Sequence, residues 1–342
     1  MTRSRIPLYL LEVACAVALA ACGGGADDGS TAAHAAQGSS SAEASRDSDE
    51  AGSNPEIDDA ARTADTEVHG DDEDTATAAD GGSREELAAA NARVRRLIAD
   101  GRTDTYTLID RALGGHASET PDCAHPGFGP HITQAFDHEL GKAAFVFTLH
   151  VDPDDDRCTN ADRQRNEIKV YSPSDDYLKG FNGDTLTYRW RFKLDKHFQP
   201  SRSFTHIHQI KAVDGDDGSP IITLTPRAGR PEQLQLIHVD SKGERKVLAH
   251  VPLEQFKGRW IDAYERITYG SQGSYSLSLR NLADGKVLWR HSARLDMWRD
   301  GATFVRPKWG LYRSLDDREA LRDESLRFDR FCIAKGQDNC TK

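Results

Sequence analysis

Three short segments of this chain place ionisable side chains where a purely structural strand would carry apolar ones. The first is Arg163–Lys169. Because side chains alternate between the two faces of a strand, one face would carry three cations and a carboxylate. These residues are Arg163, Arg165, Glu167 and Lys169. Such a row can bind an anionic ligand; a solvent-exposed charged face is the alternative interpretation.

The second segment, residues 204–212, contains two histidines two positions apart. Alternation puts His206 and His208 on one face of a strand, and Gln209 and Lys211 on the other. Two histidines at this spacing could ligate a metal, but no third ligand accompanies them at a convincing spacing. We therefore expect no metal here, and a structural role for whichever pair faces the core.

The third segment, residues 306–313, carries a candidate acid and base. Lys308, Gly310 and Tyr312 would share one face, and Gly310 would let a ligand approach the backbone closely. A Tyr and a Lys projecting from the floor of a groove can exchange protons with a bound substrate. A structural strand with an aromatic residue packed at its end is the alternative.

These segments need a β scaffold to position them. Stretches rich in β-branched and aromatic residues, separated by turn signals, recur through the second half of the chain. We predict strands at residues 145–151, 167–171, 187–194, 204–212, 221–226, 234–239, 260–269, 274–281, 287–291, 308–313 and 325–333. This pattern predicts an all-β, concanavalin-like jelly-roll sandwich, whose concave sheet would suit an extended polymer.

A short helical segment should precede the sandwich. Ser83 with Glu86 forms a potential capping box that opens a helix through Ile98. A second helix is expected at Thr105–Leu113. The predicted organisation is a leader at residues 1–22, a tether at 23–82, a helical lead-in at 83–120 and the sandwich at 121–342.

The amino terminus has the features of an export signal. Arg3 and Arg5 precede an apolar stretch that is too short to span a bilayer. The residues Leu19-Ala20-Ala21-Cys22 match a lipobox, in which the cysteine is acylated. We expect an exported protein anchored through Cys22 to the outer membrane, facing the periplasm or the cell surface. An ordinary signal peptide that is cut after Ala21 is the alternative.

The tether is predicted to be disordered, because its Ala, Gly, Ser, Thr, Asp and Glu cannot bury enough apolar surface to offset ordering entropy. Residues 1–86 hold about 19 acids and 5 bases, so this segment accounts for the negative formal net charge of -11. The folded part is close to neutral, which argues against a nucleic-acid partner.

Four cysteines remain after the leader: Cys123, Cys158, Cys332 and Cys340. An even number in an exported protein indicates two disulfides, with three possible connectivities. We favour Cys123–Cys158 and Cys332–Cys340, the second of which would close a short C-terminal loop.

The three segments together resemble the strand motifs of jelly-roll polysaccharide lyases, the group of alginate lyase, glucuronan lyase and heparin lyase I. Those motifs have the patterns Arg-x-Glu, Gln-x-His and Lys-x-Gly-x-Tyr. Here they correspond to Arg165-Asn166-Glu167, Gln209-Ile210-Lys211 and Lys308-Trp309-Gly310-Leu311-Tyr312. The resemblance spans residues 145–333.

One departure leaves the strand register open. Aligning Gln209 with the family glutamine puts Lys211 where the family has its histidine. The alternative register places His206-Ile207-His208 on that motif and turns the other face toward the ligand.

The resemblance implies β-elimination on a uronic acid. Arg165 and Gln209 would bind the carboxylate next to the C5 proton and stabilise the enolate-like intermediate. Lys211 or His208 would remove that proton, and Tyr312 would protonate the departing O4. A lysine base would need a lowered pKa. The expected substrate-binding residues are Arg163, Glu167, Lys169, His206, Lys308 and Arg313.

The expected partner is an anionic polysaccharide (alginate, glucuronan or a glycosaminoglycan), bound by a monomer without a cofactor. The acidic turns at residues 152–156 and 214–217 could bind structural calcium, although such turns are usually only turns.

Two other function classes compete. A non-catalytic carbohydrate-binding protein would use Trp190, Trp298 or Trp309 as stacking platforms. A glycoside hydrolase needs two carboxylates aimed at one bond, and no strand of the Glu-x-Asp-x-Glu kind is found in the sequence.

Overall fold

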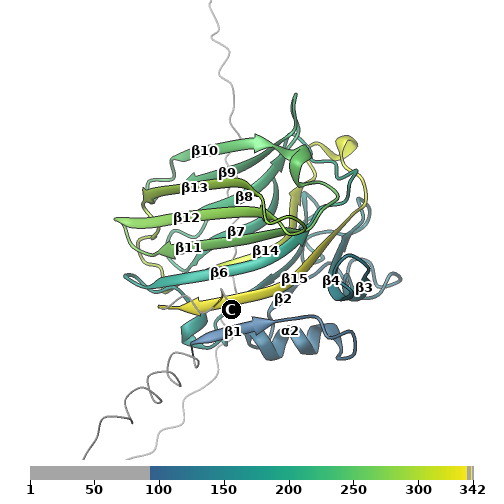
Figure 1. Ribbon diagram of the computed structural model, residues 1–342, viewed down its shortest axis with the longest axis horizontal. Coiled ribbons are helices and arrows are strands. Elements are labelled where there is room, and N and C mark those ends of the chain that lie inside the picture. The colour runs from purple at the N-terminus through teal and green to yellow at the C-terminus, as the bar shows by residue number, and fades with distance from the viewer. Residues whose placement is uncertain (1–92, 337–339, 341–342) are drawn as a thin grey trace, which may run out of the picture. The chain divides into compact units, whose positions relative to one another are not determined.

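The computed structural model describes residues 93–336 and 340, which form two antiparallel sheets packed face to face (Figure 1). The predicted leader, the tether and residues 83–92 lie outside the described residues. In the part of the chain that the structure describes, no helix has the length and apolar character needed to cross a membrane.

The eight-stranded sheet has one branch, since β1 (Val94–Leu97) pairs with β15. Its path runs through β13 (Val287–Leu295), β12 (Gly273–Asn281), β11 (Ile261–Thr268), β6 (Thr185–Lys193), β15 (Glu324–Lys335), β4 (Lys142–Leu149) and β3 (Ile132–Asp137). The seven-stranded sheet runs through β10 (Arg245–Pro252), β9 (Gln233–Val239), β8 (Ile222–Arg227), β7 (Thr205–Val213), β14 (Phe304–Ser314), β5 (Arg163–Lys169) and β2 (Ser118–Glu119). Within residues 93–336, the helices are α2 (Thr105–Leu113) and the short 3-10 helices η1 (Asp176–Leu178), η2 (Leu253–Phe256) and η3 (Arg318–Ala320).

The core lies between the sheets and is built from every second side chain of each strand. Trp309 of β14 packs on Trp190 of β6 and on Phe331 of β15, with ring centroids 6.0 and 5.2 Å apart. All three side chains are buried. The predicted all-β jelly-roll sandwich is confirmed, and its eleven predicted strands all overlap observed ones.

The described part of the lead-in, residues 93–120, is only partly helical. Helix α2 has the predicted bounds, and the Asp104 carboxylate caps it by accepting a hydrogen bond from the Thr107 backbone N–H at 2.9 Å. The helix predicted through Ile98 is wrong over Val94–Leu97, which form β1 against β15. Backbone pairing to a strand edge outweighs the helix propensity of this segment.

The sequence patterns missed four strands: β1, β2, β3 and β10. Strand β10 is an edge strand with mostly exposed side chains, and β2 has only two residues. Neither carries the apolar alternation that indicates a strand. Both favoured disulfides are confirmed, with Cα–Cα distances of 5.8 Å for Cys123–Cys158 and 5.7 Å for Cys332–Cys340.

Candidate active site

The three segments that carry ionisable side chains become neighbouring strands in the middle of the seven-stranded sheet. Strand β14 lies between β7 and β5. Lys308 of β14 pairs with Gln209 of β7 on one side and with Lys169 of β5 on the other. Residues far apart in the sequence therefore form one continuous row.

Alternation sends the ionisable residues of these strands to the outer face of the sheet. Ile168, Ile210 and Trp309 belong to the core, so their sequence neighbours point away from it. The outer-face residues are Arg165, Glu167, Lys169, Gln209, Lys211, Arg306, Lys308 and Tyr312. We call this set, together with Glu119 of β2, the outer-face cluster.

The carboxylate of Glu119 contacts three cations of the cluster. It lies 2.6 Å from Lys308 Nζ, 2.9 Å from Lys169 Nζ and 3.3 Å from Arg165 Nη1. Burial alone would raise the pKa of Glu119, but Lys308, Arg165 and Lys169 hold that pKa well below its usual range. Glu167 lies 3.3 Å from Lys308 Nζ and accepts a hydrogen bond from the Gln209 amide. The two carboxylates therefore fix the cations in place.

Lys169 is a cation of the cluster with a lowered pKa. Burial lowers its pKa to about 8; Arg306 and Lys308 act in the same sense, and Glu119 in the opposite one. This lysine therefore titrates close to physiological pH, although it was expected only to bind substrate.

Arg165 is held by acids and covers the ring of Tyr312. Its Nε donates to Asp156 at 2.9 Å, and its guanidinium lies 4.0 Å from the Tyr312 ring centroid. The Tyr312 hydroxyl accepts a hydrogen bond from Arg163 Nη1 at 3.2 Å. Two of the predicted cations thus orient the phenol that was predicted to be the general acid.

An irregular pairing between β14 and β7 separates the two histidines. Trp309 pairs with His208, but the next pair is Tyr312 with His206, so β14 carries one extra residue there. Such a bulge shifts the alternation of one strand relative to its neighbour. His206 consequently lies beside Tyr312, with ring centroids 5.9 Å apart, whereas His208 stacks on Trp309 at 5.6 Å. The expectation that both histidines share one face is wrong.

His208 points into the core. Its Nε2 lies 2.9 Å from Oε2 of Glu265 on β11, and its Nδ1 lies 2.9 Å from the carbonyl oxygen of Lys308. Because protein groups engage both ring nitrogens in the interior, His208 cannot act as a base at the outer face. Of the two registers left open by the sequence, the observed one places Gln209 and Lys211 in the row of Lys308.

His206 occupies the position beside the phenol. Its Nδ1 lies 2.7 Å from Thr225 Oγ1 on β8. Burial lowers the pKa of His206 to about 3, helped by the positive charges of Arg227, Arg165 and Lys308. The imidazole is therefore neutral at physiological pH in the free protein.

Gly310 has a different role from the one expected. A Cβ at this position would lie 2.1 Å from the carbonyl oxygen of Asn166 on β5. The residue is glycine because two backbones approach closely at the bulge, and this packing accounts for it without a ligand.

Arg313 lies apart from the outer-face cluster, contrary to its expected role in substrate binding. Its Nε donates to Gln164 Oε1, and its Nη1 to the Arg322 carbonyl oxygen, both at 2.8 Å. Arg313 therefore ties β14 to β5 and to the segment before β15.

Sequence reasoning missed Glu119, Asp156 and Arg306. Arg306 continues the alternation of Lys308 and Tyr312 on β14, so the strand pattern could have revealed it. Glu119 and Asp156 come from outside the three segments, on β2 and on the loop before β5, and only the fold brings them to Arg165.

Two of the aromatic residues named as stacking platforms are buried. Trp190 is 1% exposed and Trp309 is 0% exposed. Neither can present a ring to a sugar, so that part of the carbohydrate-binding alternative is wrong.

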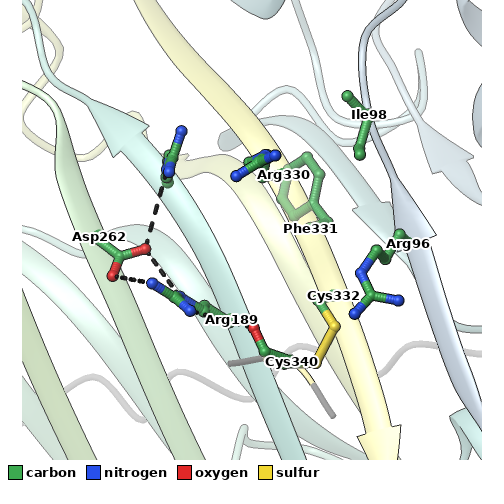
Figure 2. Close-up of a pocket in the computed structure, with 9 residues that line it drawn as sticks. Arg96, Ile98, Arg189, Asp262, Arg330, Phe331, Cys332 and Cys340 are labelled. Atoms are coloured by element: carbon green, nitrogen blue, oxygen red, sulfur yellow. Dashed lines mark hydrogen bonds and ion pairs between the residues drawn. A yellow bond between two sulfur atoms is a disulfide. The ribbon is translucent and has the colours of Figure 1, made fainter. Parts of the chain in front are cut away.

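A separate pocket lies on the outer face of the eight-stranded sheet, beside the Cys332–Cys340 disulfide (Figure 2). Arg189 is held there by two hydrogen bonds to Asp262, at 3.0 and 2.9 Å. Arg191 lies 3.4 Å from Asp329. These pairs account for both arginines as structural groups, and the pocket contains none of the predicted catalytic or substrate-binding residues.

The comparison with protein families gives the class of this protein. The family model for polysaccharide lyases matches residues 140–329. This match covers more than half of the 342-residue chain, so the chain belongs to the polysaccharide lyase family. The protein is a polysaccharide lyase, as the three motifs predicted.

Several solved structures are similar to the chain. An endo-β-1,4-glucuronan lyase from the fungus Trichoderma reesei shares 17% identity at a TM-score of 0.44, over 59% of this chain and 86% of that chain. A family 7 alginate lyase in complex with substrate shares 14% identity at a TM-score of 0.44, over 71% and 92% respectively. For an alginate lyase from Klebsiella pneumoniae, the identity is 14%, the TM-score 0.41 and the coverage 60% and 85%. No curated protein matches this chain.

Proposed function

We propose that this polysaccharide lyase cleaves a uronic-acid polymer by β-elimination, with Tyr312 as general acid and His206 as general base. The observation that carries the proposal is the placement of these two side chains on neighbouring strands, beside the cation-rich cluster. In β-elimination the base removes the C5 proton and the acid protonates O4 on the adjacent carbon. The two groups must therefore converge on one small region of the substrate.

The charge of the cluster suits an anionic polymer. The cations are Arg165, Lys169, Lys211, Arg306 and Lys308. The carboxylates that face them are Glu119, Asp156 and Glu167. These cations lie in the paired rows of β5, β14 and β7, and positive side chains of this kind suit a bound uronate. Neutralising the substrate carboxylate makes the neighbouring C5 proton removable, because the charge of the enolate-like intermediate is then stabilised.

The separation along β7 favours His206 over Lys211 as the base. Lys211 is five residues beyond His206, or roughly 16 Å along an extended strand. A lysine at that distance from Tyr312 cannot remove the C5 proton of the sugar whose O4 Tyr312 protonates. Lys211 and its pair Arg306 instead suit the carboxylate of a neighbouring sugar.

The bond between His206 and Thr225 is compatible with a basic Nε2. If Nδ1 carries the hydrogen and donates it to Thr225 Oγ1, then Nε2 keeps the lone pair that accepts the C5 proton. The substrate carboxylate adds a negative charge beside cations that otherwise lower the pKa of His206. Binding therefore raises this pKa and makes the imidazole a stronger base when substrate is present.

Export and lipid anchoring remain part of the proposal. The lipobox that ends at Cys22 and the acidic tether would place the enzyme on a membrane surface, where it meets extracellular polymers.

The test is to incubate the purified protein with alginate, glucuronan, a glycosaminoglycan and a neutral glucan. Elimination leaves a double bond between C4 and C5, so at least one uronate should give an ultraviolet-absorbing product and the glucan none. New reducing ends without this absorbance would indicate hydrolysis, and binding without cleavage would support the carbohydrate-binding alternative. Either result would contradict the proposal.

A further inference from the structure

A second cluster of ionisable side chains lies outside the outer-face cluster, near one end of the sandwich. It consists of His125, His131, His150 and Asp154, and one ligand atom from each lies within 4.8 Å of the others. His125 precedes β3 in a loop, His131 directly precedes β3, His150 directly follows β4, and Asp154 lies in the loop before β5. Segments that are separate in the sequence therefore supply the four groups.

All three imidazoles direct a nitrogen at the carboxylate of Asp154. The distances to its oxygens are 2.9 Å from His125 Nδ1, 3.1 Å from His131 Nε2 and 2.9 Å from His150 Nδ1. The side chains of His131 and Asp154 are 0% exposed. A buried carboxylate surrounded by three histidines is a donor set of nitrogen and oxygen atoms typical of transition metals.

The spacing of the rings also fits one central ion. The ring centroids of His125, His131 and His150 lie 5.6, 5.0 and 5.7 Å apart. Three imidazoles on one tetrahedral ion, with metal–nitrogen bonds of about 2.0 Å, have centroids roughly 5 Å apart. The rings therefore need only a small movement to coordinate a common metal.

One nitrogen in the cluster lacks a hydrogen bond. His131 Nδ1 lies 2.9 Å from Asp122 Oδ1, whose carboxylate also accepts a hydrogen bond from Tyr106 at 2.6 Å. With its hydrogen on Nδ1, neutral His131 turns the lone pair of Nε2 toward Asp154. Among the described residues this buried Nε2 has no hydrogen-bond partner. Two lone pairs that face each other need a positive charge between them.

We propose that His125, His131, His150 and Asp154 bind a zinc ion. Four protein ligands close the coordination sphere, as in structural rather than catalytic zinc sites. Three nitrogen ligands disfavour calcium and magnesium, which select oxygen. Asp122 is the outer partner that fixes the ring of His131, an arrangement common around zinc-bound histidines.

A proton on His131 is the competing occupant. Burial alone would lower the pKa of His131, but the neighbouring carboxylates of Asp122 and Asp154 raise it to about 9. A proton can therefore lie between the two groups in the metal-free protein, and zinc would displace it.

The proposed zinc site is hydrogen-bonded to β5, the strand that carries Arg165. On either side of Arg165, Asn166 Nδ2 donates to the His131 carbonyl oxygen and Gln164 Nε2 to the His150 carbonyl oxygen. The loop that supplies Asp154 also supplies Asp156, which binds Arg165. Zinc would therefore stabilise the loop that positions one edge of the outer-face cluster.

The first experiment uses the wild-type protein. After removal of metals with a chelator and dialysis against zinc, elemental analysis should find about one zinc per chain. The Tm should rise by roughly 5 °C or more when zinc is in large excess over its Kd, whereas calcium and magnesium should have no such effect. Bound Co2+ should show the intense visible absorption of a tetrahedral site. A chain that takes up no zinc under these conditions would overturn the proposal and leave the proton as the occupant.

The second experiment locates the ion. His150→Ala and His131→Ala should each lose most of the bound zinc and the zinc-dependent rise in Tm, while His197→Ala, at an exposed histidine outside the cluster, should keep both. If a ligand variant does not fold, the Co2+ spectrum of the wild-type protein still reports on nitrogen ligation. Full zinc occupancy in folded His150→Ala and His131→Ala would overturn the assignment. Because zinc content and Tm are the readouts, the result is independent of the lyase mechanism.

Discussion

Tyr312 of β14 and His206 of β7 lie opposite each other with ring centroids 5.9 Å apart, because a one-residue bulge at Gly310 and Leu311 shifts the register between their strands. Without the bulge, alternation would keep His206 on the same side as His208, inside the sandwich. The acid and base proposed here therefore depend on a local irregularity in one strand.

Replacement of the phenol should affect turnover more than binding. Tyr312→Phe keeps the ring that packs under Arg165 but removes the proton that O4 needs. We expect kcat to fall by about a hundredfold or more, with KM almost unchanged. Initial rates of unsaturated product formation would measure this, and kcat within a factor of a few of wild type would show that another group is the acid.

The base can be identified by comparing two residues on β7. His206→Gln should lower kcat by about a hundredfold. Lys211→Ala should mainly raise KM, because this lysine lies too far along the strand to reach the same sugar. Full steady-state kinetics on a cleaved uronate would separate the two effects, with His197→Gln as a surface control. A larger loss of kcat in Lys211→Ala than in His206→Gln would show that Lys211 is the general base.

The buried His206 should make stability depend on pH. Its pKa in the folded protein, about 3, lies below its ordinary value of 6.5, chiefly because of burial. The folded state thus favours the neutral ring, and its stability falls as the pH drops from 6.5 toward 3. Between about pH 7 and about pH 4.5, wild type should lose about 2 kcal/mol more unfolding free energy than His206→Gln. Urea titrations would measure both losses, and equal losses would contradict the assigned shift.

The Cys123–Cys158 disulfide should contribute substantially to stability. It closes a loop over a sequence separation of 35, and chain entropy predicts that its removal costs about 4 kcal/mol. Replacing both cysteines by Ser should lower the urea midpoint accordingly, and mass mapping of the wild type should find no free thiol. Removal of the Cys332–Cys340 disulfide, which spans a sequence separation of only 8, should lower the unfolding free energy by less. This double variant is the matched control.

Lipid anchoring depends on Cys22. Cys22→Ser should release the mature protein from the membrane fraction, because the acylated cysteine is the proposed anchor. Fractionation of cells that express both forms would measure this, and continued membrane retention of the variant would refute anchoring at Cys22.

The sequence by itself determined the sandwich class, the presence of two disulfides among four cysteines and the residues of the three ionisable strands. Each of these follows from local chemistry: alternation with turn signals, an even cysteine count and charged side chains in strand positions. Helix α2 was predicted with its observed bounds for the same reason, since the pattern of its apolar positions lies within nine residues.

Only the tertiary structure decided which of these residues meet. Val94–Leu97 became a strand because β15 offered an edge for pairing. Glu119 and Asp156 reached Arg165 only through the fold. His206 and His208 were separated by an extra residue on the partner strand β14, which no pattern within β7 could reveal. The side-chain period of a strand is two, so one inserted residue reverses which face a neighbour contacts. Pairing between distant segments sets that register, and the sequence of one strand does not contain it.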